Sequence, residues 1–275
     1  MEKVWNTDEG LYAYWWPQPG YRTDIGNWGD IIAPHIIRWL SGKKPIFKEK
    51  GGYRYITVGS ILHLLQEYDI VWGTGMIDDR AINVPEGVVF HAVRGPLTRE
   101  CLIKQGINVP EVYGDPGMLM KYIYMPDVDV EYSVGVIPHA VDVEEYKKKI
   151  TKKLKEKFDL HFIDIWGGVE YVMDEVAKCE IIISSALHGI ILAESLGKPT
   201  AFVVMSNKII GGQFKFKDYY LSTGRKDITP IDWVKKIGAN EIKKAICWAE
   251  EITKPKIDLE KLLEACPFNF KNRKL

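Results

Sequence analysis

The chain has 275 residues, 46% of them hydrophobic, which suffices for one large or two medium globular domains. Its 37 basic residues balance its 37 acidic ones, which argues against a partner held by overall charge, such as nucleic acid or an anionic membrane. No apolar run reaches about 18 residues and the first residues lack a signal-peptide pattern, so we expect a cytoplasmic protein without stable membrane insertion.

The segment Tyr12–Tyr21 (YAYWWPQPGY) is crowded with aromatic side chains, in a chain that holds nine tryptophans. Exposed aromatic faces commonly bind sugars. Packing in a core or in a subunit interface explains such a cluster at least as well. The sequence leaves both interpretations open.

The first half of the chain alternates short apolar runs with helical segments flanked by turn residues. It predicts strands at Tyr55–Val58, Ile70–Trp72 and Val88–His91, and helices at Asp30–Ser41 and Pro96–Gln105. The motif GNWGD at Gly26–Asp30 precedes the first helix, with Asp30 at or near its cap. The motif is not GxGxxG, so a dinucleotide site is not indicated.

The segment Tyr122–Tyr132 contains a proline and clustered acidic residues without a helical period, so we predict an inter-domain linker there. This prediction divides the chain into an N-terminal α/β domain, residues 1–125, and a C-terminal α/β domain, residues 133–275. The last helix could pack back on the N-terminal domain. Two α/β halves facing each other across a cleft is the expected architecture.

The second half resumes the alternation of strands and helices. It predicts strands at Ser133–Ile137 and Leu160–Ile163, and helices at Val143–Phe158, Val169–Lys178, Asp232–Glu251 and Leu259–Ala265. The helix at Val143–Phe158 is rich in lysine and glutamate. Its mixed charges at helical spacing favour a solvated helix face over a nucleic-acid arm.

The stretch Ile181–Val203 (IIISSALHGIILAESLGKPTAFV) predicts one strand–helix–strand unit. The β-branched run Ile181–Ile183 is typical of a strand buried on both faces of a parallel sheet. An apolar helix is expected over Leu187–Leu196, and a second strand over Thr200–Val204. Such units bind their ligands beyond the carboxyl ends of the strands.

The turn between this strand and this helix carries Ser184, Ser185, His188 and Gly189. The serines have the chemistry to accept hydrogen bonds from the first helical N–H groups, and a helix N-terminus attracts anions. A packed histidine bonded to a carbonyl is the alternative interpretation of His188. The position alone does not decide between packing and function.

Other polar residues also follow predicted strands or helix starts. They are Gly73, Thr74 and Gly75 after Ile70–Trp72; Arg94 in VRGPLTRE; Asp115 in YGDP; His139 and Asp142 in IPHAVD; and Lys215 and Lys217 in GQFKFKDYYLSTGR. Each one is more often structural than functional. Their shared placement at strand ends favours a common site.

Four cysteines, Cys101, Cys179, Cys247 and Cys266, are widely scattered. They form neither a CxxC pair nor a Cys/His cluster, so they argue against a zinc site and a disulfide framework. We expect buried free thiols and see no strong constellation for another metal.

Taken in order, the motifs GNWGD, VWGTGM, VRGPLTRE, VYGDPGML, VIPHAVD, SSALHGIILAESLGKPT and FKFKDYYLSTG resemble the polysaccharide pyruvyl transferase family, especially its bacterial exopolysaccharide branch. The resemblance runs from about Gly26 to Gly224. It implies two Rossmann-like domains in a GT-B-like arrangement, phosphoenolpyruvate as the donor co-substrate with no other cofactor, and a pyruvate ketal formed on a glycan or lipid-linked oligosaccharide. Another branch carries an arginine two residues before the histidine, where this chain has Ala186.

The chemistry requires an acid, a base for the hydroxyl and cations for the donor, and no metal. On the resemblance we expect His188, Asp30 and Asp115 to be catalytic. The donor-binding residues are expected to be Arg94, Ser185, Gly189, Lys215, Lys217 and His139, with the C-terminal domain as the donor side. Acceptor-binding residues are expected at Asn27, Gly73, Thr74, Gly75 and Glu194, with further sugar contacts in Tyr12–Tyr21.

Two other functions stay open at this point. In a glycosyltransferase with a nucleotide-sugar donor, Glu194, the one charge inside the apolar helix, would hold a ribose; alternatively it is a satisfied helix carboxylate. A noncatalytic glycan-binding protein is the third interpretation, because this chain has Ala186 where the other branch has a cationic arginine. The sequence also leaves a homo-oligomer open.

Overall fold

The computed structural model describes residues 9–17, 26–226, 228–252 and 254–268, which contain two five-stranded sheets with only parallel strand pairs. The N-terminal sheet has the order β2-β1-β3-β4-β5, with β1 (Leu11–Tyr14), β2 (Pro45–Phe47), β3 (Tyr55–Ile56), β4 (Ile70–Trp72) and β5 (Val89–Ala92). The C-terminal sheet has the order β10-β9-β8-β6-β7, with β6 (Tyr132–Ile137), β7 (Leu160–Phe162), β8 (Cys179–Ser184), β9 (Thr200–Val204) and β10 (Ile231–Asp232). The fold is thus mixed α/β, compatible with two Rossmann-like units.

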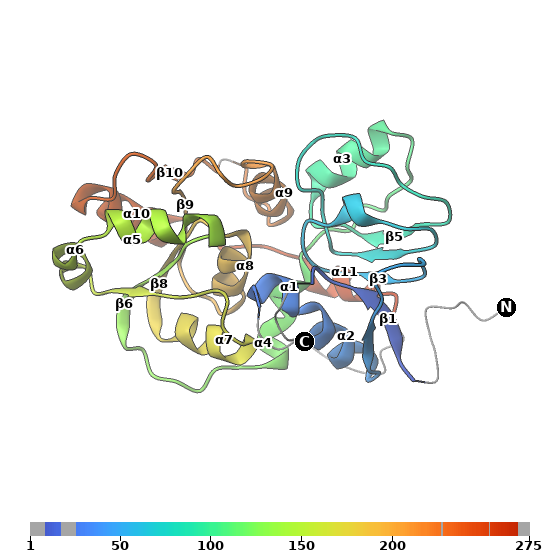
Figure 1. The fold of residues 1–275 in the computed structure, drawn as a ribbon, viewed down its shortest axis with the longest axis horizontal. Coiled ribbons are helices and arrows are strands. Elements are labelled where there is room, and N and C mark those ends of the chain that lie inside the picture. The colour runs from blue at the N-terminus through green and yellow to red at the C-terminus, as the bar shows by residue number, and fades with distance from the viewer. Residues whose placement is uncertain (1–8, 18–25, 227, 253, 269–275) are drawn as a thin grey trace.

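The helices cover the sheets and fill the space between them (Figure 1). They are α1 (Trp28–Ile31), α2 (Ala33–Ser41), α3 (Pro96–Lys104), α4 (Met120–Ile123), α5 (Val143–Lys149), α6 (Lys152–Lys157), α7 (Val169–Ala177), α8 (Leu187–Ser195), α9 (Phe214–Ser222), α10 (Ala239–Glu251) and α11 (Leu259–Glu264). Three 3₁₀ turns, η1 (Leu62–Leu64), η2 (Pro116–Leu119) and η3 (Ala140–Asp142), follow strand ends or a strand-end loop. No helix in the described part of the chain combines the length and apolarity needed to cross a bilayer.

Two predicted helices are interrupted. Val143–Phe158 is split into α5 and α6, because Ile150 is extended and Thr151 starts a new helix by accepting a 3.3 Å hydrogen bond from the Leu154 amide. The first helix begins at Trp28 and is divided at Ile32. The four cysteines are free, but only Cys179 is buried, so the expectation of four buried thiols is wrong.

Both sheets have the same strand order when strands are numbered along the chain, namely 2-1-3-4-5. In this order the second strand lies on one side of the first strand, and the third strand lies on the other. The connections that follow the first and third strands therefore run in opposite directions, which opens a crevice at the carboxyl ends of these two strands. These ends belong to β1 and β3 in one sheet and to β6 and β8 in the other. In Figure 1 α1, α8 and α9 lie between the two sheets.

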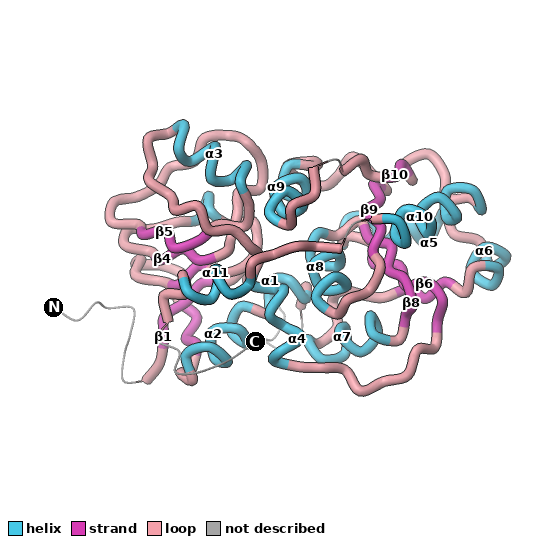
Figure 2. Tube along the Cα trace, turned by 180° about the vertical axis from the view of Figure 1, so that it is seen from behind, coloured by secondary structure: helices cyan, strands magenta, loops and turns pink. Residues whose placement is uncertain are grey.

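The end of the described chain returns to the N-terminal sheet, where α11 lies beside it (Figure 2). The Trp72 Nε1 donates a 2.8 Å hydrogen bond to the Leu262 carbonyl, and the Phe268 ring packs 4.7 Å from the Tyr55 ring, centroid to centroid. One hydrophobic cluster therefore joins Trp72 to residues of both sheets, including Ile182 of β8.

The N-terminal sheet also buries an ion pair. Arg54 and Asp69 are both 0% exposed, and Arg54 Nη2 lies 2.7 Å from Asp69 Oδ2. The Asp69 carboxylate also accepts hydrogen bonds from the Arg54 and Gln66 amides, at 3.0 and 2.9 Å. A buried pair with this many partners is costly to break from one side, because the remaining charge is left without water or a counter-ion.

We expect Asp69→Ala to lower the free energy of unfolding by about 3–5 kcal/mol. Glu100→Ala is the matched control, because Glu100 pairs with Lys104 on an exposed helix face, and it should cost less than about 1 kcal/mol. Urea denaturation measures both. Equal losses in the two variants would contradict this account of the buried pair.

Candidate active site

A cavity of about 370 Å³ lies where the carboxyl ends of the two sheets meet. Its lining follows the strands of both sheets: Trp16 after β1, Ser60 after β3, Ile77 after β4, His139 after β6, Trp166 after β7, His188 after β8 and Lys215 after β9. Asn27 and Asp30 line it from the start of α1. The position of the cavity is thus a direct consequence of two parallel sheets with facing carboxyl ends.

His188 and Asp115 face each other beside this cavity, one from each half of the chain. His188 Nε2 lies 3.9 Å from Asp115 Oδ2, and each atom is buried without a hydrogen-bond partner among the described residues. The other Asp115 oxygen accepts a 2.9 Å hydrogen bond from the Gly117 amide and so caps η2. At 3.9 Å the two atoms are too far apart for a hydrogen bond, and a small movement on ligand binding would bring them within reach of one.

Burial sets the charge of both side chains. Loss of water, together with repulsion from Lys215 and Arg94, lowers the pKa of His188 to about 3. Burial raises the pKa of Asp115 to about 6, against a smaller opposing effect from the Gly117 amide. Near neutral pH the imidazole is therefore unprotonated and the carboxyl largely ionised, so His188 starts as a proton acceptor.

Gly29 lets the His188 ring approach α1. A Cβ built on Gly29 would overlap the imidazole, and the glycine has no positive φ that would itself exclude a side chain. Alanine would stabilise the helix more than glycine does. A glycine at this position is therefore explained by the space that the His188 ring needs.

Lys215 and His139 are the other titratable groups on the C-terminal wall. Burial lowers the pKa of Lys215 to about 8, with Arg94 repelling it and Asp30 attracting it. Burial also lowers the pKa of His139 to about 4, and Lys215 adds repulsion. The Lys215 ammonium makes no hydrogen bond or ion pair with the residues that the structure describes. This arrangement favours a bound anion.

The start of α1 differs from the prediction. Asn27 is the cap, because its Oδ1 accepts a 3.2 Å hydrogen bond from the Gly29 amide, and Asp30 lies in the first turn with the cavity beside it. Asp30 is thus near the cap, as expected, but the cap itself is Asn27.

Ser184, Ser185 and Gly189 have structural contacts. The α8 cap is Ala186, without a side-chain bond, so the expected serine cap of this helix is wrong. Ser185 donates a 2.7 Å hydrogen bond to Asp142 and accepts one from the His139 amide, which ties the loop after β6 to the end of β8. Gly189 is buried where a Cβ would meet the Ser184 hydroxyl. Neither Ser185 nor Gly189 lines the cavity.

Arg94 is buried outside the cavity lining with its guanidinium engaged. It donates to Asp218 at 3.1 Å, to the Ser60 hydroxyl at 2.7 Å and to the Met76 carbonyl at 2.6 Å. Asp218 also accepts from the Thr98 amide and hydroxyl at 2.9 and 2.7 Å. Arg94 therefore connects the N-terminal half to α9, the helix that carries Lys215, rather than presenting donors to a ligand.

The Gly73–Gly75 turn also packs against protein and does not line the cavity. A Cβ on Gly73, where φ is +92°, would overlap Pro116, and a Cβ on Gly75 would overlap the Arg94 guanidinium. Thr74 donates a 2.9 Å hydrogen bond to the Gly59 carbonyl. This geometry does not favour the expected contacts of the turn with an acceptor.

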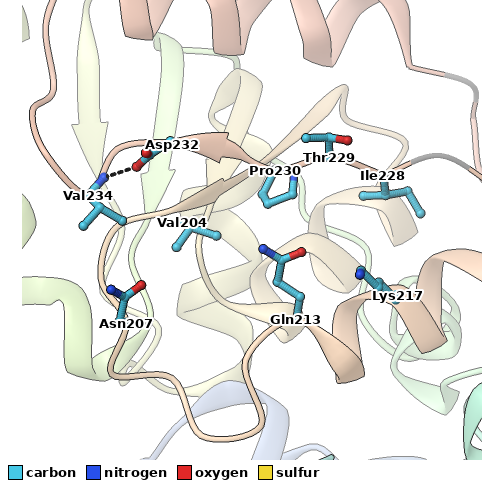
Figure 3. Close-up of a pocket in the computed structure, with 9 residues that line it drawn as sticks. All are labelled: Val204, Asn207, Gln213, Lys217, Ile228, Thr229, Pro230, Asp232 and Val234. Atoms are coloured by element: carbon cyan, nitrogen blue, oxygen red, sulfur yellow. Dashed lines mark hydrogen bonds between the residues drawn. The ribbon is translucent and has the colours of Figure 1, made fainter.

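Glu194 and Lys217 lie outside the cavity as well. Arg225 binds both Glu194 oxygens, at 2.6 and 2.8 Å, and the Tyr219 hydroxyl donates to the same carboxylate at 2.7 Å. Lys217 lines a separate pocket with Gln213 and Asp232 (Figure 3). The Glu194 carboxylate thus has protein partners for both of its oxygens. Lys217 follows Lys215 by two residues in α9, so the two side chains leave the helix in different directions.

Among the cavity residues that are missing from the prediction for the site, Ser60, His63 and Trp166 are the ones with polar or aromatic side chains. Trp166 follows the strand predicted at Leu160–Ile163, and Ser60 and His63 follow the one predicted at Tyr55–Val58. The strand-end rule that selected His139 would have found all three.

We expect Gly29→Ala to lower the free energy of unfolding by about 1–3 kcal/mol, since the new methyl group overlaps the His188 ring. In a His188→Ala background the same change should be neutral or stabilising, because the obstruction is gone. Urea denaturation of the four proteins in this double-mutant cycle measures the coupling. An equal cost in both backgrounds would contradict the described contact.

Comparison with known proteins agrees with the motif series. The model of the polysaccharide pyruvyl transferase family matches residues 23–207. The uncharacterized protein L143 of Acanthamoeba polyphaga mimivirus is 32% identical over 170 residues, covering 59% of this chain and 57% of that protein. The succinoglycan biosynthesis protein ExoV of Rhizobium meliloti is 24% identical over 226 residues, covering 78% of this chain and 65% of ExoV.

The chain thus spans less than two thirds of the length of either curated relative. No solved structure matches it. The family match extends over more than half of the chain and includes Asn27, Asp30, Asp115, His139 and His188. The chain belongs to the polysaccharide pyruvyl transferase family.

Proposed function

We propose that the protein transfers the pyruvyl group of phosphoenolpyruvate to two hydroxyls of a glycan sugar, in the biosynthesis of an exopolysaccharide or another cell-surface polysaccharide. Family membership and the likeness to ExoV support the reaction class. The observation that carries the proposal is the His188–Asp115 pair at the edge of a cavity that also holds a desolvated lysine.

Lys215 is the cation proposed to hold the donor. Its ammonium has lost water, and among the described residues it makes no hydrogen bond or ion pair, only a cation–π contact with the Phe216 ring at 5.6 Å from the centroid. An anionic carboxylate or phosphate would restore what burial removed. Ala186, where another branch has an arginine, lines the same cavity and leaves room beside it. The cavity is lined by Ala186, Leu187 and His188 at the start of α8, and the positive end of the helix dipole would add to the attraction. Lys215 therefore takes over the role expected of the missing arginine.

The reaction can be written with every atom assigned. One sugar hydroxyl gives its proton to His188 and its oxygen bonds to C2 of the donor, while the methylene carbon C3 receives the proton from His188 and becomes a methyl group. The bond from C2 to the phosphate oxygen then breaks as a second hydroxyl attacks C2. The second hydroxyl proton leaves with the phosphate, and the products are a ketal and inorganic phosphate.

In this scheme Asp115 is a positioning residue. Its carboxylate is fully buried and does not line the cavity, but it faces the His188 nitrogen that would carry positive charge. An ionised Asp115 stabilises the imidazolium and orients the ring, as a buried carboxylate does behind other catalytic histidines.

The two halves then divide the substrates in a GT-B-like arrangement. Lys215, His139 and His188 come from the C-terminal half, residues 133–275, which we assign to the donor. Asn27 and Asp30 come from the N-terminal half, residues 1–125, which we assign to the acceptor. Asp30 would orient the attacking hydroxyl. The nucleotide-sugar alternative gains no support from Glu194, because both its oxygens are bound by Arg225.

We expect Lys215→Met to weaken phosphoenolpyruvate binding by about tenfold or more, a loss of about 1.4 kcal/mol. Lys217→Met is the matched control, since it removes the same charge from the same helix but faces another pocket. Its affinity should stay within about twofold of the unchanged protein. Isothermal titration calorimetry with phosphoenolpyruvate measures both, and an equal response of the two variants would contradict the assignment.

The transfer rate should fall as pH falls through about 6, because protonation of Asp115 removes the charge that stabilises the His188 imidazolium. Above this pKa the carboxylate form predominates and the rate should be level until Lys215 loses its proton near pH 8. Asp115→Asn should transfer about 10²–10⁴-fold more slowly and lose the acidic limb. An acidic limb that persists in Asp115→Asn would show that another group controls it.

A further inference from the structure

We propose that Trp16 and Trp166 form a carbohydrate subsite in which a sugar ring packs on an indole face beside Asp30 and Asn27. The two tryptophans come from opposite sheets and line the same cavity. Assigning this sugar as the pyruvyl acceptor rests on the proposed function, whereas the binding of the sugar itself does not.

Trp16 is held outside the core by its neighbour. Trp15 is 6% exposed and packs edge-on against Phe47 with the ring centroids 5.0 Å apart, while the next residue, Trp16, is 42% exposed. The Trp16 indole makes no hydrogen bond or ring contact with the residues that the structure describes. A large apolar ring exposed at the mouth of a cavity is typical of a surface that a ligand covers.

Trp166 is brought to the same cavity by the backbone of the loop after β7. The Ile165 carbonyl accepts a 2.9 Å hydrogen bond from the Trp28 amide, and the Trp166 amide donates a 3.0 Å hydrogen bond to Asp164. These bonds fix the loop against the first turn of α1. Trp166 is thereby placed at the end of α1 that carries Asn27 and Asp30.

The polar groups beside the indoles suit a sugar. The Asp30 side chain lines the same cavity as the two indoles and as the Lys215 ammonium, which it attracts. Asn27 adds an amide from the same turn of α1. A carboxylate and an amide bind neighbouring hydroxyls, and an indole covers the apolar C–H face of the ring. An anionic ligand would instead be repelled by the Asp30 carboxylate.

This placement also orders the two substrates. Trp16, Asp30 and Lys215 line one cavity, so a sugar held by the indoles would have its hydroxyls within the space that the donor also enters. The subsite would thus determine which hydroxyl pair receives the ketal.

The test measures sugar binding without transfer. Methyl glucoside, methyl galactoside, methyl mannoside and N-acetylglucosamine are titrated into the full chain, with saturation-transfer NMR and tryptophan fluorescence as readouts. At least one sugar should bind, and Trp16→Ala and Trp166→Ala should each weaken it about 5- to 10-fold. Trp16→Phe and Trp166→Phe, which keep a ring, should recover most of the affinity.

Tyr122→Ala is the control, because Tyr122 is 37% exposed, stacks on Trp39 and does not line the cavity. It should bind sugars as the unchanged protein does. All variants should bind phosphoenolpyruvate within about twofold of the unchanged protein, which also shows that they are folded.

Two results would overturn the subsite: no sugar binds the unchanged protein, or the alanine variants bind it equally well. Sugar binding that depends on both tryptophans in a protein that does not bind phosphoenolpyruvate would support the subsite and refute the proposed transfer. The failures of the two proposals are therefore distinguishable.

Discussion

The buried ion pair between Arg94 and Asp218 holds together the geometry on which the candidate site depends. Arg94 follows β5 in the N-terminal half, and Asp218 lies in α9 of the C-terminal half, one turn from Lys215. Both side chains are 0% exposed, so separating the two halves at this point would leave charges without counter-ions or water. The pair fixes α9 at the cavity and places Lys215 where, among the residues that the structure describes, no carboxylate forms an ion pair with it.

A second consequence of burial is the charge state of the site. The same loss of water that lowers the pKa of Lys215 to about 8 and of His188 to about 3 raises that of Asp115 to about 6. Each shift reflects the cost of holding a buried charge, and at Lys215 and His188 a bound anion would offset that cost. A donor that brings negative charge would reverse the effect on the histidine and favour its protonated form. Binding of the donor and readiness for proton transfer are then linked by electrostatics.

The sequence predicted the placement of the site better than the role of each residue. Strand periodicity located most strands of both sheets, and the rule that ligands bind at strand ends selected His139, His188 and Lys215 correctly as neighbours. The same rule also selected Arg94, Ser185 and the Gly73–Gly75 turn, which the structure uses for packing and internal hydrogen bonds. A sequence shows that a residue follows a strand. It does not show whether the side chain points into the cavity or into the protein.

Two other features could not be predicted locally. The Arg94–Asp218 contact joins residues 124 positions apart, and the proximity of Gly29 to His188 depends on how one half packs on the other. The break between α5 and α6 had a local signal in Thr151, which is a good helix cap. The lysines on both sides of Thr151 fit one continuous helix equally well, so this signal was missed.

The central claim is that this cavity couples an anionic enol donor to a glycan through His188. The most direct measurement is phosphorus NMR of phosphoenolpyruvate incubated with the protein and a glycan extract, followed by mass spectrometry of the glycans. The account predicts inorganic phosphate only when protein and glycan are both present, a ketal-linked pyruvate on the glycan, and a rate about 10²–10⁴-fold lower in His188→Gln. Transfer at an unchanged rate by His188→Gln, or phosphate release without any pyruvate on the glycan, would contradict it.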